Sequence, residues 1–135
     1  MENDENNSQN ELMMKLSFFE HQISQIQQQL EMIEKGIIEM NSLGLGLEEF
    51  KGAEGREVLA QIAKNIFVKT KLISDELIVD IGGGNFIKKS IEDTRKLIGE
   101  QTKKLERLRG ELNSALEKIN DELTKTIMEA QSKKN

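Results

Sequence analysis

Side chains able to carry out chemistry are few and scattered in this sequence of 135 residues. His21 is the only histidine and there is no cysteine, so a catalytic triad, a thiol nucleophile and a Cys/His zinc site all lack required groups. Adjacent carboxylates occur at Glu48-Glu49, Glu92-Asp93 and Asp121-Glu122, but neighbours along a helix point in different directions. We expect these acids to lie on a solvated surface, and we predict no enzyme activity, no metal and no cofactor.

A glycine-rich stretch, Gly82-Gly83-Gly84, is the other chemical candidate, because phosphate-binding loops also follow strands. No Gly-Lys-Ser/Thr follows it, however, and the spacing G-x-G-x-x-G is absent. The stretch is more typical of a hairpin turn whose residues need positive φ.

The charge balance excludes several classes of partner. The chain carries 24 acidic and 19 basic side chains, a net charge of −5, which argues against nucleic-acid binding. A basic cluster over 103–109 favours pairing with the acidic N-terminal region, or docking of an acidic partner, over nucleic acid. No run of about 18 apolar residues occurs, so we predict no membrane partner. The lack of cysteine suits a reducing compartment, and we expect a cytoplasmic protein.

Two long amphipathic segments must position whatever site the chain has. Seven of the ten glycines lie between Gly44 and Gly84, which leaves glycine-poor flanks on both sides. In the first flank, apolar residues recur with gaps of four and three, the heptad repeat of a coiled coil. With Leu16 at position a, this seam consists of Leu12, Leu16, Phe19, Ile23, Ile26, Leu30, Ile33, Ile37 and Met40.

The second flank carries a matching seam. Its predicted members are Ile91, Thr94, Ile98, Gln101, Leu105, Leu108, Leu112, Ala115 and Ile119, although Leu116, Leu123 and Ile127 leave the C-terminal register open. Ser90 is the predicted N-cap, with acids in the first turn. Residues 1–50 have a charge balance of −8 and residues 85–135 one of +3. Opposite charge favours pairing within one chain, as an antiparallel helical hairpin, over parallel self-association.

The middle of the chain is rich in β-forming residues. Two pairs of short segments, each pair separated by turn residues, predict two successive β-hairpins. Four such strands cannot form a stable sheet sandwich alone, and their free edges invite pairing with other chains. We therefore predict an oligomerisation module whose contact residues are Val58, Ala60, Ile62, Phe67, Val68, Leu72, Leu77, Val79, Ile81 and Phe86.

The resulting fold class is α+β, mostly α: an antiparallel two-helix coiled coil joined by two β-hairpins. We expect the following boundaries: a disordered tail over 1–10, a helix over 11–43, a linker over 44–56, the hairpins over 57–87, a helix over 88–131 and a tail over 132–135.

The central motifs resemble those of the prefoldin family, in particular the archaeal α-class subunit. The resembling stretches are Phe50–Leu59, then Asn65-Ile-Phe-Val-Lys-Thr-Lys-Leu72, then Leu77–Asp93, which includes Ile-Val-Asp-Ile-Gly-Gly-Gly. Family members often carry a "VP.G" turn in the first hairpin, whereas this chain has Ala60–Asn65. That departure leaves open whether the chain resembles a standard α subunit or a divergent paralogue.

The resemblance implies a hexamer of two α and four β subunits, whose hairpins build a β-barrel body with projecting coiled coils. It also implies a holdase that works without ATP, binds unfolded proteins at the coiled-coil tips and delivers them to a group II chaperonin. The alternative is a coiled-coil scaffold or filament-forming assembly protein without unfolded clients.

Apolar residues away from the seam, near the free end of the predicted helical hairpin, give an independent reason to consider client binding. Methionine is deformable and suits irregular apolar targets. The residues alone leave client binding and simple packing equally open, and the resemblance favours client contact. The candidate client-binding residues are Met13, Met14, Phe18, Ile127 and Met128.

Overall fold

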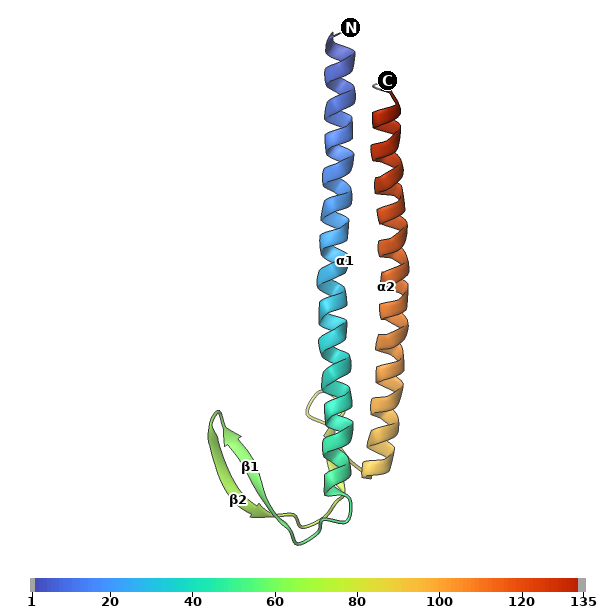
Figure 1. The fold of residues 1–135 in the computed structure, drawn as a ribbon. Helices are drawn as coiled ribbons and strands as arrows, with labels where there is room; N and C mark the ends of the chain where they lie inside the picture. The colour runs from blue at the N-terminus through green and yellow to red at the C-terminus, as the bar shows by residue number, and fades with distance from the viewer. Residues whose placement is uncertain (1, 134–135) are drawn as a thin grey trace. The chain divides into compact units, whose positions relative to one another are not determined.

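The computed structural model describes residues 2–133, which form two long helices and four short strands (Figure 1). The elements are α1 (Glu2–Phe50), β1 (Glu57–Ala63), β2 (Ile66–Lys71), β3 (Leu77–Asp80), β4 (Phe86–Lys89) and α2 (Ile91–Lys133). The predicted fold class, two helices joined by two β-hairpins, is confirmed. The chain divides into two compact units: a coiled-coil unit of residues 1–36 and 105–135, and a hairpin unit of residues 37–104.

Helix α1 is longer at both ends than the sequence predicted. It continues past residue 43 to Phe50 because Gly44 and Leu47 take the next a and d positions of the heptad, and Leu47 is buried. It also includes residues 2–10, where a disordered tail was predicted; Met1 lies outside the described residues. Residues 3–10 are all exposed and carry no apolar seam.

The end of α1 has a defined stop signal. The amide of Ala53 donates to the carbonyl of Phe50 at 3.1 Å, and Gly52 has φ of +70°. A left-handed conformation at this place ends a helix without the steric cost that other residues would incur.

Helix α2 has the N-cap that the sequence predicted, but it begins at Ile91 and not at residue 88, because Lys88 and Lys89 belong to β4, and its register also differs from the prediction. The Ser90 hydroxyl accepts a hydrogen bond from the amide of Asp93 at 3.0 Å, which confirms the N-cap. The predicted tail at 132–135 starts inside this helix, and residues 134–135 lie outside the described part.

Along α2, Thr102 and Arg109 are half-buried on the seam where Gln101 and Leu108 were predicted. The large side chains of Leu112, Leu116 and Leu123 impose the spacing, and Ala115 is too small to compete with them. The seam then runs Thr102, Leu105, Arg109, Leu112, Leu116, Ile119, Leu123, Thr126 and Ala130.

In the coiled-coil unit, the two helical stretches lie side by side and antiparallel (Figure 1). Ile33 is buried on the seam, and the Arg109 Nη1 group lies 2.9 Å from Glu34 Oε1. A Cβ on Gly36 would lie only 3.3 Å from Leu105 Cδ1, so glycine permits a close approach here. The predicted antiparallel pairing of an acidic with a more basic helix is confirmed in this unit.

In the hairpin unit, β1 pairs antiparallel with β2, and β3 pairs antiparallel with β4. The first pair contains a register shift between Gln61 and Ala63 and turns at Asn65, which has φ of 65°. The second pair turns through Gly82, Gly83 and Gly84, all with positive φ, as predicted.

Buried side chains in the hairpin unit are Ile37, Leu47, Ala53 and Ile91. The Arg95 guanidinium lies 2.7 Å from the Glu48 carboxylate and connects the two helices on the unit's surface. Because so few side chains are buried, most of the apolar surface of the strands stays exposed within a single chain.

Candidate functional site

The tip of the coiled-coil unit consists of the N-terminal part of α1 and the C-terminal part of α2, here residues 4–19 and 123–130. Three predicted client-binding residues on α1 are strongly exposed: Met13 by 68%, Met14 by 74% and Phe18 by 59%. They occupy heptad positions e, f and c, so none of them fills the seam. Met14 and Phe18 are four residues apart and therefore share one face of the helix.

The two predicted residues on α2 lie at the same level as those on α1. Glu34 lies opposite Arg109, and Gly36 lies opposite Leu105. Because the helices are antiparallel, an equal number of residues toward the N-terminus of α1 and toward the C-terminus of α2 brings Met14 level with Met128. With Leu116 and Leu123 at position a, Ile127 falls at e and Met128 at f. Both side chains are exposed.

The heptad positions distribute these residues around the tip of the helix pair. In an antiparallel pair, the e positions of the two helices flank the same side of the seam, so Met13 and Ile127 lie on one side. Met14 and Met128 lie at f, where each side chain is turned away from the partner helix, and Phe18 at c lies toward the other side of the seam from Met13. We call the set Met13, Met14, Phe18, Ile127 and Met128 the apolar band. All five residues that the sequence suggested are exposed at the tip, on different faces of the helix pair, and their role in client binding stays a prediction.

Phe18 is supported from the seam. Its ring lies 6.3 Å from that of Phe19, at an interplanar angle of 56°, a favourable tilted arrangement. Phe19 is half-buried on the seam, so one face of Phe18 is anchored while the rest stays open to solvent.

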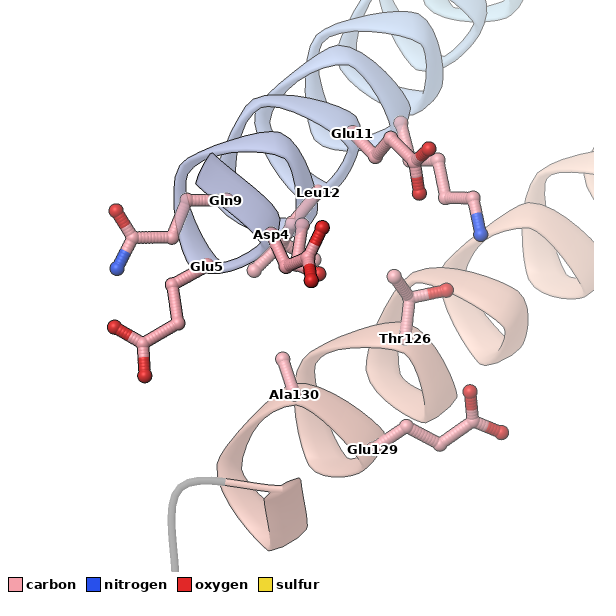
Figure 2. A pocket seen from close by; sticks show the side chains of 10 residues that line it. Asp4, Glu5, Gln9, Glu11, Leu12, Thr126, Glu129 and Ala130 are labelled. Carbon is pink, nitrogen blue, oxygen red and sulfur yellow. The ribbon is translucent and has the colours of Figure 1, made fainter. Parts of the chain in front are cut away.

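An open cleft of about 630 Å³ lies between the two helices at the tip, and the sequence reasoning missed it. Figure 2 shows Thr126 and Ala130 of α2 directed toward the gap, with Asp4 and Leu12 across it. The cleft forms because small side chains face Leu12 and because the next seam positions on α1, Gln9 and Glu5, are polar. Ten residues line it: Asp4, Glu5, Ser8, Gln9, Glu11, Leu12, Lys15, Thr126, Glu129 and Ala130.

The predicted oligomerisation residues divide into two groups in the hairpin unit. Exposed ones are Ile62, Phe67, Val68, Ile81 and Phe86, and half-buried ones are Val58, Ala60, Leu72, Leu77 and Val79. In the second hairpin, the paired registers Ile78↔Lys88 and Asp80↔Phe86 place Ile78 and Phe86 on one exposed face.

Within residues 57–89, which hold the four strands, four exposed apolar residues were not predicted: Leu59, Ile66, Ile73 and Ile78. Ile73 is 94% exposed although its neighbours are fixed. The Leu72 amide donates to the Arg56 carbonyl at 2.9 Å, and the Glu76 amide donates to the Ser74 hydroxyl at 3.0 Å. Leu72 and Ile73 are adjacent apolar residues, so the sequence pattern does not show which of the two side chains is buried and which is exposed.

His21 is exposed on α1, and no group of three or more His, Asp or Glu side chains within residues 2–133 gathers in a way that could hold a metal ion. In the same part of the chain, no helix has the length and apolarity to cross a membrane. What the chain presents is apolar surface in two places, the apolar band and the faces of the hairpins.

Comparison with known proteins gives consistent results. The family model for the prefoldin subunit matches residues 19–135. A prefoldin subunit alpha of Methanobrevibacter smithii is 33% identical over 98 residues, covering 72% of this chain and 67% of the relative. A prefoldin subunit alpha of Methanosphaera stadtmanae is 26% identical over 88 residues, covering 65% of this chain and 64% of that relative, slightly less than two thirds of its length.

A solved structure has the same fold. A chain of the filamentous prefoldin of Methanocaldococcus jannaschii, determined by cryo-electron microscopy, superposes with a TM-score of 0.76. The sequences are 21% identical, and the match covers 86% of this chain and 98% of that one.

Proposed function

Since this chain belongs to the prefoldin subunit family, we propose that it is a holdase subunit that binds unfolded proteins without ATP. In this proposal it works in the cytosol and passes its clients to a group II chaperonin. It is a chaperone-type subunit and not an enzyme, and the binding itself needs no cofactor.

The observation that carries this proposal is the apolar band. Five apolar side chains that do not fill the seam are exposed around the tip. Isolated exposed apolar residues are ordinary, but here five of them lie at the tip of two helices, and four are methionine or phenylalanine side chains at least 59% exposed. Such a concentration of exposed apolar residues supports a binding role. Methionine side chains adapt to targets of different shape, which suits clients without a fixed structure.

The hairpin faces support the assembly part of the proposal. An isolated two-stranded hairpin is marginal in water, and here both hairpins expose large apolar residues. We propose that these faces and strand edges pair with those of β-type subunits, two α with four β, to form a β-barrel body. Several tips on one body then act on the same client, which raises the effective concentration of weak binding sites.

The test begins with the assembled protein. The chain is mixed with a β-type prefoldin subunit, the mass of the assembly is measured, and the aggregation of a denatured client is followed by light scattering without nucleotide. We expect suppression of aggregation. A well-formed assembly that fails to suppress it would exclude the holdase function.

The tip assignment has its own variant. Changing Met13, Met14 and Phe18 together to Ser should weaken suppression by roughly fivefold or more while the assembly mass stays unchanged, because the lost contacts are multiplied over several tips. Met32→Ser is the control, since Met32 is equally exposed on α1 but lies away from the tip. Unaltered suppression by the triple variant would show that clients bind elsewhere.

A second candidate function is a filament-forming scaffold without unfolded clients. It is favoured by one observation, the likeness to a chain from a filamentous prefoldin. Mass measurement of this chain alone distinguishes the two, since the scaffold predicts open-ended growth of a single subunit type and no effect on client aggregation.

A further inference from the structure

The sulfur of this chain is concentrated in exposed thioethers. The sequence holds six methionines and no cysteine, so any oxidation of sulfur must occur at methionine. Four of them are strongly exposed: Met13 by 68%, Met14 by 74%, Met32 by 74% and Met128 by 63%. Met40 is half-buried on the seam of α1, which protects it from solvent.

Three of the four exposed methionines belong to the apolar band. Met14 and Met128 lie at the same level on the two helices, and Met13 is next to Met14. These three thioethers supply most of the band, whose other members are Phe18 and Ile127. A chemical change to methionine therefore changes the proposed client-binding surface more than any other surface of the coiled-coil unit.

We propose that Met13, Met14 and Met128 form an oxidation site through which hydroperoxides lower the capture of clients. This inference rests on the proposed holdase function and adds its regulation. Oxidation converts a flexible apolar side chain into a polar sulfoxide, which favours water over an apolar client. The change is reversible, because methionine sulfoxide reductases restore the thioether.

The reaction balances with hydrogen peroxide as the only co-reactant. A lone pair of the methionine sulfur attacks one peroxide oxygen, a sulfur–oxygen bond forms and the oxygen–oxygen bond breaks. The leaving hydroxide takes the proton from the transferred oxygen and departs as water. Sulfur loses two electrons and peroxide gains them, which leaves a neutral sulfoxide.

Oxidation of these three methionines should leave the packing between the two helices intact. The three tip methionines occupy positions e and f, outside the seam, so a sulfoxide there stays in water and displaces no packed side chain. Met40 on the seam is the opposite case, because a sulfoxide at a half-buried packing position disrupts the contact between helices. Loss of binding should therefore precede loss of structure as oxidation proceeds.

The experiment uses the assembled protein treated with graded hydrogen peroxide. Peptide mass spectrometry gives the order of oxidation, which we expect to be Met13, Met14, Met32 and Met128 before Met40. At the dose that oxidises the first four, the chain concentration needed to halve client aggregation should rise by roughly threefold or more, while assembly mass and helical content hold. Treatment with methionine sulfoxide reductases should restore capture.

Two variants assign the effect to the tip. The triple variant Met13→Leu, Met14→Leu and Met128→Leu keeps apolar side chains of similar volume but removes the thioethers, so peroxide should leave its client capture at the level measured before treatment. Met32→Leu removes a thioether of equal exposure away from the tip and should stay as sensitive as the unchanged chain.

The outcomes separate this inference from the function on which it rests. Capture that survives full oxidation of the three tip methionines would overturn the inference and leave the holdase function standing, as would a triple variant that remains peroxide-sensitive. If the untreated assembly fails to suppress aggregation, both ideas fall together.

Discussion

At the residue scale, two glycines on the helices differ in how closely they are packed. Gly110 on α2 has open space where a Cβ would be, so nothing in the structure requires glycine there. Gly36 on α1 lies against Leu105, whose Cδ1 would be 3.3 Å from an added Cβ. Both glycines reduce the helix propensity of the coiled-coil unit, but only Gly36 has a packing reason.

This difference predicts the effect of two alanine substitutions. Gly110→Ala should stabilise the coiled-coil unit by about 0.5–1 kcal/mol, the usual difference in helix propensity. Gly36→Ala should gain clearly less or lose stability, because Leu105 must move. Thermal unfolding followed by circular dichroism, with both variants at the same chain concentration, measures the two. Equal stabilisation by the two substitutions would mean that Leu105 can move at no cost and that the close approach does not require glycine at position 36.

At the scale of elements, the register of α2 decides which leucines pack. Continuing the spacing of three and four residues from Ile91 put Gln101 and Leu108 on the predicted seam. The later leucines bury more area than Ala115 and shift the seam to Thr102 and Arg109. At this position Arg109 forms an ion pair with Glu34. An exposed ion pair contributes less than about 1 kcal/mol to stability, but it favours this pairing of the two helices.

Two leucines therefore differ in their effect on stability. Leu112→Ala should destabilise the helix pair by about 1–3 kcal/mol, because Leu112 is half-buried on the seam. Leu108→Ala should cost less than about 0.5 kcal/mol, as is usual for exposed positions. Denaturant unfolding of the two variants provides the comparison. A larger cost at Leu108 would restore the register predicted from the sequence.

At the scale of the whole molecule, a single chain buries little of its apolar surface, and we expect other chains to cover part of the rest. Of residues 2–133, only five apolar side chains are buried in the isolated chain, and the hairpin faces stay open. An α-type subunit of the prefoldin family is part of an oligomer, and the exposed hairpin residues are where we expect the contacts to form.

This expectation gives a prediction for assembly. Changing Ile78 and Phe86 together to Ser should abolish or strongly weaken the assembly with β-type subunits, because both side chains form one exposed face of the second hairpin. Helical content should persist, since neither residue packs on the seam. Mass photometry and circular dichroism measure the two effects, with Met32→Ser as a control that should assemble normally. A double variant that assembles like the unchanged chain would place the interface elsewhere.

The sequence by itself determined the helix–hairpins–helix order, the Ser90 cap, the glycine turn with positive φ and the five candidate tip residues. These features depend on periodicity and local backbone chemistry, which a sequence displays directly. Only the tertiary structure decided the register of α2, the full length of α1, the close approach at Gly36 and the level along the helix pair that Met14 and Met128 share. Each of these depends on which side chains compete for space between two helices, and that competition exists only once the helices are paired.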